Sequence, residues 1–511
     1  AIESCVFSTT PTNGMFQLTT TFVLAVAAIF SHRSRAMRLR LLDQDVAERF
    51  GAACLDGSRP AYWIDPATNG ASKSKWIIYL QGGAYCATPE MCRVRSTTRL
   101  GSSNVLPNDV HPGGILDSLS ANNPTFSSFN RILISYCDGF FFLGNRSSPY
   151  VMADGKHLHF RGQANLDATL YSLMNLRTPY GLSDATEVLI GGGSAGGIST
   201  VFHADYIKKK WLKHVPKVFG VSISGFFLSI PRLTGSNVSI DSIASATQLH
   251  NATLKNNCTM MLGKSREANC FNVPESYSFL TIPFFVINSA YDHYALMDWA
   301  TGSQLGSRSS CLDPRLQFKN CNESQVYDLN LWYDTFVHEL TARSTFSRKG
   351  NGAFIESCLE HVAAENSGPF NNYRINETSI NEALTAWWNS DGNNPAEMHT
   401  YKPCRLVPGI DPVQCMNSCF TSPQPSSNSS QKPYMGLSMG TFIIMGCIIV
   451  VSIVLIFMAT WKLLFVRRRK DTRKSSHVPW ETSAVRHRRL EDEEYSEHPF
   501  HHGSHTELAS M

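Results

Sequence analysis

Four short apolar runs, each followed within a few residues by glycine or aspartate, constrain the fold of this chain most strongly. The runs span residues 76–80, 131–135, 187–190 and 283–288. Continuous apolar runs bounded by turn residues are typical of strands that are buried on both faces of a parallel sheet. Helix-like segments occupy residues 163–176 and 197–211. This alternation predicts an α/β fold, in which helices cover both faces of a doubly wound, mostly parallel sheet.

The composition is that of a large folded domain from the secretory pathway. Apolar residues make up 43% of the chain and charged residues 17%, which is too apolar for a disordered protein. The 45 basic and 41 acidic residues nearly balance, and this argues against a nucleic-acid binder, which needs a basic stripe. Fourteen cysteines are many for a cytosolic enzyme and indicate several disulfides.

An uncharged segment near the C-terminus predicts a membrane anchor. Residues 441–465 are almost wholly apolar, and no charged residue lies between Lys432 and Lys462. A run of ~20 apolar residues crosses the hydrocarbon core of a bilayer as one helix. The basic residues 467–470 that follow belong on the cytoplasmic side. We therefore expect a single-pass type I protein of the cell surface or a secretory-pathway membrane, with its large N-terminal part outside the cell or in the lumen.

Three further features agree with this topology. Residues 19–30 have the length of the apolar region of a signal peptide, although an uncleaved anchor is the alternative. Seven Asn-x-Ser/Thr sequons all precede the predicted anchor. Twelve cysteines lie between Cys54 and Cys419, an even number that suits a fully oxidised domain. Two pairs, Cys86 with Cys92 and Cys415 with Cys419, are close enough to form local disulfides.

These boundaries divide the chain into five predicted parts. They are a signal peptide or N-terminal extension (1–36), an α/β domain (37–420), a Ser/Pro-rich stalk (421–440), the transmembrane helix (441–465) and a cytoplasmic tail (466–511).

The segment 192–196, Gly-Gly-Ser-Ala-Gly, carries the sharpest chemical signal. It fits the G-x-S-x-G nucleophile elbow, in which a tight turn from strand to helix projects a serine hydroxyl above the sheet. An apolar run precedes Ser194 and a helix-like segment follows it. The start of that helix offers backbone N–H groups to a developing negative charge. Ser194 is therefore the candidate nucleophile, and a structural glycine-rich turn is the alternative.

A serine nucleophile also needs a base and an acid that orients the base. Hydrolases with this elbow order the three groups as Ser, Asp or Glu, then His. Asp292 follows the last apolar run, and His361 lies farther on, in a segment that reads as a loop. Order and placement favour this pair. The alternatives along the chain are Asp298 and Asp313 for the acid, and His293 and His338 for the base.

The turn after the first apolar run supplies the other half of an oxyanion hole. Gly82, Gly83 and Ala84 let a backbone N–H approach a substrate oxygen, and the N–H of Ala195 is the second donor. No cluster of histidines and acids has metal-ligand spacing. We therefore expect an enzyme without a cofactor.

Several longer motifs resemble those of the pectin acetylesterase/Notum family. They are WIIYLQGG from residue 76, RLGSS from 99, NRILISYCDG from 130, HFRG from 159, GSAGG from 193, NSAYD from 288 and SCLEH from 357. The resemblance covers residues 54–361, keeps the family's order and is nearer to the plant-type enzymes. It implies an α/β-hydrolase-like fold and serine carboxylesterase chemistry without a metal.

The resemblance also implies roles for single residues. Ser194 takes the part of the nucleophile, Asp292 of the acid and His361 of the base. Gly83 and Ala195 fall where oxyanion donors are expected, with Ala84 beside them.

Two positions depart from the family pattern. A Gly-Trp pair reads Ala84-Tyr85 here, so Tyr85 keeps an aromatic wall but adds a hydroxyl. An acidic residue of the family is Ile223 in this chain. Tyr85, Phe226 and Phe227 are the candidate substrate-binding residues. The three phenylalanines at residues 140–142 have two interpretations: they line an acyl pocket, or they pack in the core.

Three functional hypotheses follow. The first is a membrane-anchored serine esterase that removes O-acyl groups, acetyl above all, from an extracellular polysaccharide such as pectin. The second is a Notum-like deacylase of a lipid-modified, palmitoleoylated protein. The third is a catalytically silent cell-surface domain, which the anchor and Ile223 favour and the presence of Ser194, Asp292 and His361 opposes.

Overall fold

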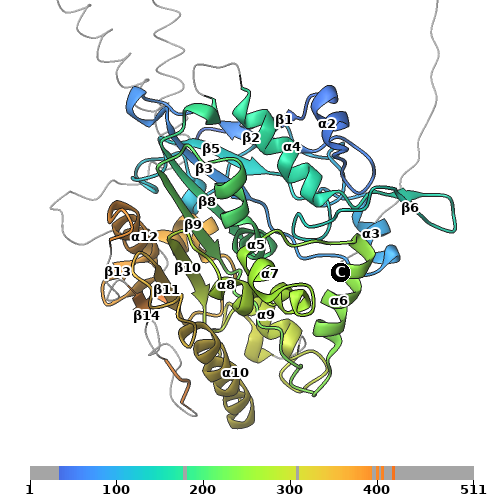
Figure 1. Cartoon of the computed structure of the whole chain (residues 1–511). Helices are drawn as coiled ribbons and strands as arrows, with labels where there is room; N and C mark the ends of the chain where they lie inside the picture. Colours follow the sequence, from blue (N-terminus) through green and yellow to red (C-terminus); the bar gives the residue numbers. More distant parts are fainter. Residues whose placement is uncertain are drawn as a thin grey trace, which may run out of the picture. The chain divides into compact units, whose positions relative to one another are not determined.

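A ten-stranded sheet forms the centre of the computed structural model (Figure 1). The structure describes residues 34–176, 181–306, 310–393, 399–401, 404–407 and 417–420. Across the sheet the strands are β14 (His399–Tyr401), β11 (Gly352–Glu356), β10 (Phe284–Ser289), β9 (Lys217–Ile223), β8 (Glu187–Gly193), β3 (Lys75–Leu80), β5 (Asn130–Ile134), β2 (Ala61–Asp65), β1 (Met37–Leu41) and β4 (Asp109–Val110). The strands from β14 to β5 are all parallel, and β2, β1 and β4 continue the sheet antiparallel. The predicted mostly parallel sheet is confirmed.

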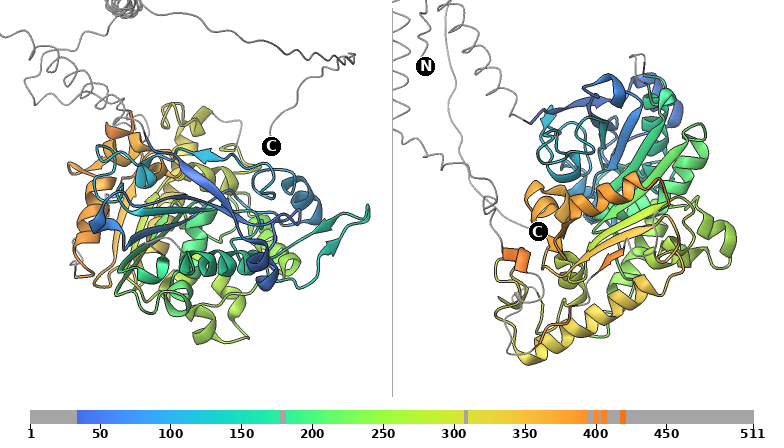
Figure 2. Two further views of the ribbon diagram at one scale, coloured as in Figure 1. Left: turned by 90° about the horizontal axis from the view of Figure 1, so that it is seen from above. Right: turned by 90° about the vertical axis from the view of Figure 1, so that its left-hand side faces the viewer.

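Helices lie on both faces of this sheet, as predicted (Figure 2). They are α2 (Gln44–Phe50), α3 (Pro89–Arg95), α4 (Gly162–Met174), α5 (Ala195–Lys210), α6 (Val238–His250), α7 (Asn257–Leu262), α8 (Val273–Ser278), α9 (His293–Trp299), α10 (Glu323–Thr341), α11 (Ser367–Asn372) and α12 (Ile380–Asn389). Two small hairpins, β6 (Tyr150–Val151) with β7 (His157–Leu158) and β12 (Arg374–Ile375) with β13 (Thr378–Ser379), complete the fold.

Alternation along β3 shows how the core is divided. Trp76 and Ile78 belong to the core cluster that includes residues of α4, α5 and α10, whereas Ile77 and Tyr79 belong to the separate cluster that includes residues of α11 and α12. Both sets are almost completely buried. A strand buried on both faces needs the continuous apolar sequence that this segment has.

The order of the strands creates a switch point between β3 and β8. From β3 the chain moves outward to β5 on one side, and it then returns to β8 on the other side. The carboxyl ends of strands at such a switch point are where open α/β sheets bind ligands. Gly82–Ala84 follows β3, and Ser194 follows β8.

Five disulfides join described cysteines. They are Cys54–Cys137, Cys86–Cys92, Cys258–Cys270, Cys311–Cys321 and Cys358–Cys419. The predicted Cys86–Cys92 pair is confirmed. The predicted Cys415–Cys419 pair is wrong, because Cys419 bonds to Cys358 in the loop after β11 and sequence proximity alone does not fix pairing. Cys415 itself lies outside the described residues.

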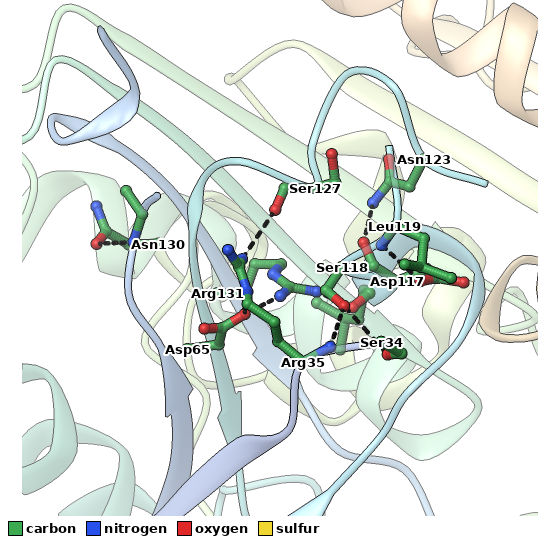
Figure 3. Close-up of polar contacts among 12 residues, drawn as sticks. Ser34, Arg35, Asp65, Asp117, Ser118, Leu119, Asn123, Ser127, Asn130 and Arg131 are labelled. Carbon is green, nitrogen blue, oxygen red and sulfur yellow. Dashed lines mark hydrogen bonds and ion pairs between the residues drawn. The ribbon is translucent and has the colours of Figure 1, made fainter. Parts of the chain in front are cut away.

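A buried ion pair joins the antiparallel and parallel parts of the sheet (Figure 3). Arg131 at the start of β5 is fully buried, and its guanidinium pairs with Asp65 at the end of β2 and donates to the carbonyl of Leu116. The partly exposed Arg35 contacts the same carboxylate at 3.0 Å. Asp65 thus ties the segment before β1 and the interior of the sheet together.

Six of the seven sequons fall within the described residues. Five asparagines are exposed: Asn145, Asn237, Asn251, Asn322 and Asn376. The sixth, Asn257, is buried, and its amide nitrogen donates to Asp205 at 2.5 Å and to the carbonyl of Phe279 at 3.1 Å. The folded domain therefore has no room for a glycan at Asn257, and Asn428 lies outside the described residues.

The predicted transmembrane segment, residues 441–465, also lies outside the described residues, as do the predicted stalk and tail and residues 1–33 of the predicted signal peptide or N-terminal extension. Within the described part of the chain, every helix is too short or too polar to span a bilayer.

Candidate active site

Ser194 lies at the turn between β8 and α5, where its backbone is strained. Its φ and ψ angles are 54° and −124°, a conformation that side-chain-bearing residues rarely adopt. The glycines around it are required by space. A Cβ on Gly196 would lie 1.9 Å from the carbonyl oxygen of Leu80, and one on Gly192 would lie 2.3 Å from that of Gly196. Strand, turn and helix therefore have the close packing of the predicted nucleophile elbow, and Ser194 is only half-buried.

The loop after β3 lies directly against this turn. A Cβ on Gly82 would stand 3.1 Å from the Cβ of Ser194. Gly83 and Ala84 have positive φ angles of 140° and 53°. Among the described residues, the N–H groups of Gly83, Ala84 and Ala195 have no hydrogen-bond acceptor. Unpaired N–H groups beside a serine at a helix start are suited to bind an oxyanion.

Asp292 and His361 form a hydrogen-bonded pair at the same edge of the sheet. Nδ1 of His361 lies 2.8 Å and 3.0 Å from the two carboxylate oxygens of Asp292. Asp292 is only 2% exposed, and it also caps α9 by accepting from the N–H of Ala295. A carboxylate at Nδ1 holds the proton there and leaves Nε2 free to accept another.

The end of β9 links the His361 loop to the nucleophile turn. The N–H of Ser194 donates to the carbonyl of Ile223 at 2.9 Å, and the N–H of Val362 donates to Oγ of Ser224 at 2.9 Å. Within the described residues, the Ser194 hydroxyl itself makes no hydrogen bond. Long contacts between nucleophile and base are common before substrate binds.

The four alternative residues lie in other surroundings. Asp298 pairs with Arg232, and Asp313 pairs with Arg315 at the surface. His338 is exposed on α10. His293 starts α9 beside Asp292, but the Asp292 carboxylate accepts from His361 instead.

Nearby acidic groups raise the pKa of the His361 imidazole. Burial lowers the pKa of His361, but the hydrogen bond and charge of Asp292, together with the charges of Glu365 and Glu360, outweigh burial and raise that pKa above its ordinary value. Burial raises the pKa of Glu365, and it raises the pKa of Glu356 far more. The base thus lies in a field that favours its protonated form.

The aromatic candidates divide into core residues and site residues. Phe226 is wrong as a substrate contact, because it is 3% exposed and packs edge-on against Tyr277 and Phe336 in the core. Phe227 is half-buried, with its ring 6.2 Å from that of His361. Tyr85 is half-buried against Phe140 and Phe141. The three phenylalanines of residues 140–142 are core residues.

Ile223, which replaces an acidic residue of the family pattern, packs in the core without disturbing it. Its side chain is fully buried among apolar neighbours that include Val221 and Ile287. What this strand end contributes to the site comes from its backbone and from Ser224.

Sequence reasoning missed three residues of the site. Tyr294 is 61% exposed, and its ring lies 4.8 Å from the imidazole of His361. Glu365 lies four residues after His361, and Ser224 follows β9. Their closeness in sequence to Asp292, His361 and Ile223 was the available signal, but it does not give the direction of a side chain.

One group of possible metal ligands lies elsewhere. Among the described residues, Cys86, Cys92 and His250 place ligand atoms within 4.8 Å of one another. The two sulfurs are joined in a disulfide, and Nε2 of His250 lies 2.9 Å from the carbonyl of Cys86. Because metal ions bind thiolates rather than disulfides, the residues as paired do not fit a metal.

Comparison with known proteins agrees with this geometry. A family model described as Pectinacetylesterase matches residues 31–407. Pectin acetylesterase 5 of Arabidopsis thaliana is 30% identical over 396 residues, which cover 76% of this chain and 86% of that protein. Pectin acetylesterase 4 of the same plant is 31% identical, over 76% of this chain and 89% of its own length.

More distant relatives act on proteins. Palmitoleoyl-protein carboxylesterase NOTUM of Schmidtea mediterranea is 29% identical over 64% of this chain and 59% of its own length. The solved structure of the Wnt deacylase Notum from Drosophila matches with a TM-score of 0.60 and 23% identity, covers 75% of this chain and all of its own, and shows the α/β-hydrolase fold. Fold, motif order and these relatives agree: this chain belongs to the pectinacetylesterase family and is a carboxylic ester hydrolase.

Proposed function

We propose that this chain is a serine esterase that removes O-acetyl groups from an extracellular polysaccharide such as pectin. The observation that carries the proposal is the hydrogen bond between His361 and the buried Asp292 at the sheet edge where Ser194 turns into α5. A nucleophile, an oriented base and unpaired N–H groups at one edge are the parts that acyl transfer requires.

The reaction follows from the positions of these groups. Ser194 Oγ attacks the ester carbonyl while Nε2 of His361 takes its proton, and Asp292 stabilises the imidazolium that forms. The N–H groups of Gly83 and Ala195, with that of Ala84 beside them, bind the oxyanion. His361 then gives its proton to the departing sugar oxygen, and an acyl-enzyme remains. Water activated by His361 releases acetate and restores Ser194.

The aromatic residues around His361 favour a sugar over a long acyl chain. Tyr294 offers an exposed flat ring at 4.8 Å from the imidazole, where the apolar face of a pyranose can stack. A long acyl chain needs a deep apolar pocket instead. Phe140, Phe142 and Phe226, which would line one, are 0–3% exposed and pack in the core.

The Notum-like alternative is deacylation of a lipid-modified protein. Relatives that are palmitoleoyl-protein carboxylesterases favour it. The silent-domain alternative has little support, since the Asp292–His361 pair and the strained Ser194 turn are both present.

A membrane anchor at residues 441–465 and a position at the cell surface are part of the proposal. The disulfides of the domain support passage through the secretory pathway, and five exposed sequons are compatible with it.

The test uses the full chain, expressed in a eukaryotic secretory pathway and purified in detergent, beside Ser194→Ala. Acetate release from acetylated pectin and turnover of nitrophenyl esters from two to sixteen acyl carbons are measured. We expect turnover of short esters and of pectin, which Ser194→Ala lowers at least ~1,000-fold. Preference for long chains supports the Notum-like alternative, and turnover that persists in Ser194→Ala contradicts the assignment of the nucleophile.

A further inference from the structure

One half-buried acid of the active site, Glu365, has no part in the mechanism above. The hydroxyl of Tyr79 in β3 donates to Oε1 of Glu365 at 2.7 Å. The same oxygen fills the side-chain space of Gly193, the last residue of β8, because a Cβ there would lie 2.0 Å from it. The carboxyl group therefore sits between the ends of the two strands that lead to the oxyanion loop and to Ser194.

Glu365 belongs to the same tight turn as the base. Val362, next to His361, has a positive φ of 56° and donates its N–H to Ser224. The N–H of Glu365 then donates to the carbonyl of Val362 at 2.8 Å, which closes the turn. The short segment 361–365 thus connects the imidazole of His361 to a carboxyl group that contacts both β3 and β8.

We propose that Glu365 is a positioning residue of the esterase site: its bond to Tyr79 fixes the His361 turn against the nucleophile strand, and its negative charge stabilises the imidazolium that forms in the transition state. The proposal rests on the serine esterase function above. The alternative is that the hydrogen bond between Tyr79 and Glu365 only stabilises the fold and has no effect on the charge of His361.

The effect of the Glu365 charge on the imidazolium depends on the other groups that face His361. They are Asp292 and Tyr294 at the start of α9, Glu360 and Glu365 in its own loop, Phe227 after β9, and His293, whose positive form opposes that of His361. Burial raises the pKa of Glu365, whereas its bond from Tyr79 and the charge of His361 lower it. Imidazolium and carboxylate therefore stabilise each other, and the coupling is greatest when His361 holds the serine proton.

Glu365→Gln and Tyr79→Phe separate charge from hydrogen bonding. The glutamine of the first variant retains an acceptor for Tyr79 and loses the charge. We expect the midpoint of the acidic limb of kcat/KM on nitrophenyl acetate to fall by about half a pH unit, because an anion that favoured protonated His361 is gone. We also expect the plateau value of kcat to fall about threefold. A pKa change of about half a unit corresponds to a threefold loss in the stability of the imidazolium, which forms in the transition state.

Tyr79→Phe keeps the acid and removes the bond that holds it ionised. We expect a smaller shift of the midpoint in the same direction. Glu365→Asp, which restores the charge, returns the midpoint toward the wild-type value. Glu339→Gln, which removes a charge from α10 instead, leaves the profile unchanged.

The outcomes distinguish this proposal from the function on which it rests. Wild-type enzyme without turnover, or with turnover that Ser194→Ala retains, contradicts the esterase function itself. An active wild type whose midpoint is the same in Glu365→Gln and Tyr79→Phe, with only the melting temperature lowered, overturns the role of Glu365. If Glu365→Gln does not fold, an unchanged midpoint in Tyr79→Phe overturns it equally.

Discussion

Three strained residues link the loops that carry the nucleophile and the base at the carboxyl edge of the sheet. Ser194, Ser224 and Val362 have positive φ angles of 54°, 45° and 56°. Two hydrogen bonds also join the three loops: the N–H of Ser194 donates to the carbonyl of Ile223, and the N–H of Val362 donates to the side-chain Oγ of Ser224. Strain of this kind costs about 1–3 kcal/mol at each position and persists only where surrounding structure enforces it. Here it holds the turns of the nucleophile and the base at one edge of the sheet.

Asp292→Asn tests the orientation of the base. Asparagine keeps the volume of the side chain but cannot hold the Nδ1 proton as a carboxylate does, so kcat falls by about 10³–10⁴-fold. Because the bond and charge of Asp292 raise the pKa of His361, the acidic limb of the pH–rate profile also moves to lower pH. Steady-state kinetics from pH 4 to 9 measure both effects. Asp298→Asn, which removes an exposed acid, is the matched control, and equal losses in the two variants contradict the assignment.

The sequence predicted the site only where position along the chain determines it. Ser194, Asp292 and His361 follow strand ends in the expected order, and the structure brings Asp292 and His361 into contact. Phe226 and Phe227 could not be distinguished by sequence, but Phe226 is buried in the core whereas the ring of Phe227 lies beside His361. Glu365 was missed because its role depends on a contact with Tyr79, 286 residues away in sequence.

At the scale of elements, the junction of β8 and α5 fixes the position of the nucleophile. Glycines allow α5 to start directly against the end of β3, and a Cβ on Gly197 would likewise lie only 2.9 Å from the Cα of Gly225. The helix is nearly all buried after this start. A side chain at any of these glycines would separate helix and strand and move Ser194 from its neighbours.

Gly196→Ala tests this packing. The added Cβ would lie 1.9 Å from the carbonyl oxygen of Leu80, which is backbone and cannot move freely. We expect a loss of about 1–3 kcal/mol or more in the free energy of unfolding, and a loss of activity beyond that. Gly70→Ala, where nothing lies within 4 Å, is the control and should change stability little. Urea denaturation measures the difference, and equal stability of the two variants refutes the packing argument.

Strand prediction succeeded where sequence was apolar and failed where glycine interrupted it. The runs at 76–80, 131–135, 187–190 and 283–288 became β3, β5, β8 and β10. β9 carries Lys217 and Gly220, and β11 begins at Gly352, so neither gave a continuous apolar signal. Both contribute to the site, because β9 ends beside Ser224 and β11 leads to the His361 loop.

At the scale of the whole domain, the antiparallel strands depend on the buried Asp65–Arg131 pair (Figure 3). Arg131 is fully enclosed at the border between β5 and β2, and Asp65 supplies its carboxylate partner. Taking one partner from a buried pair leaves a charge that neither water nor protein compensates. The sequence offered no sign of this pair, since a lone arginine in a strand usually faces solvent.

Asp65→Asn should therefore destabilise the domain strongly. We expect a loss of about 3–5 kcal/mol in the free energy of unfolding, because Arg131 stays buried without its counter-charge. Arg35→Ala removes the partly exposed partner of the same carboxylate and should cost less than about 1 kcal/mol. Denaturation with disulfides intact measures both. Similar losses in the two variants would show that burial of Arg131 has little energetic weight.

The Cys358–Cys419 disulfide has a consequence for any release of the domain from the membrane anchor that we propose. It ties the loop that carries His361, three residues away, to the segment 417–420 just before the predicted stalk. A protease that sheds the domain must therefore cut beyond Cys419 to free it. Cleavage shortly before that cysteine would leave the domain bonded through sulfur to the fragment that continues into the stalk, so a second, reductive step would be needed before it could diffuse away.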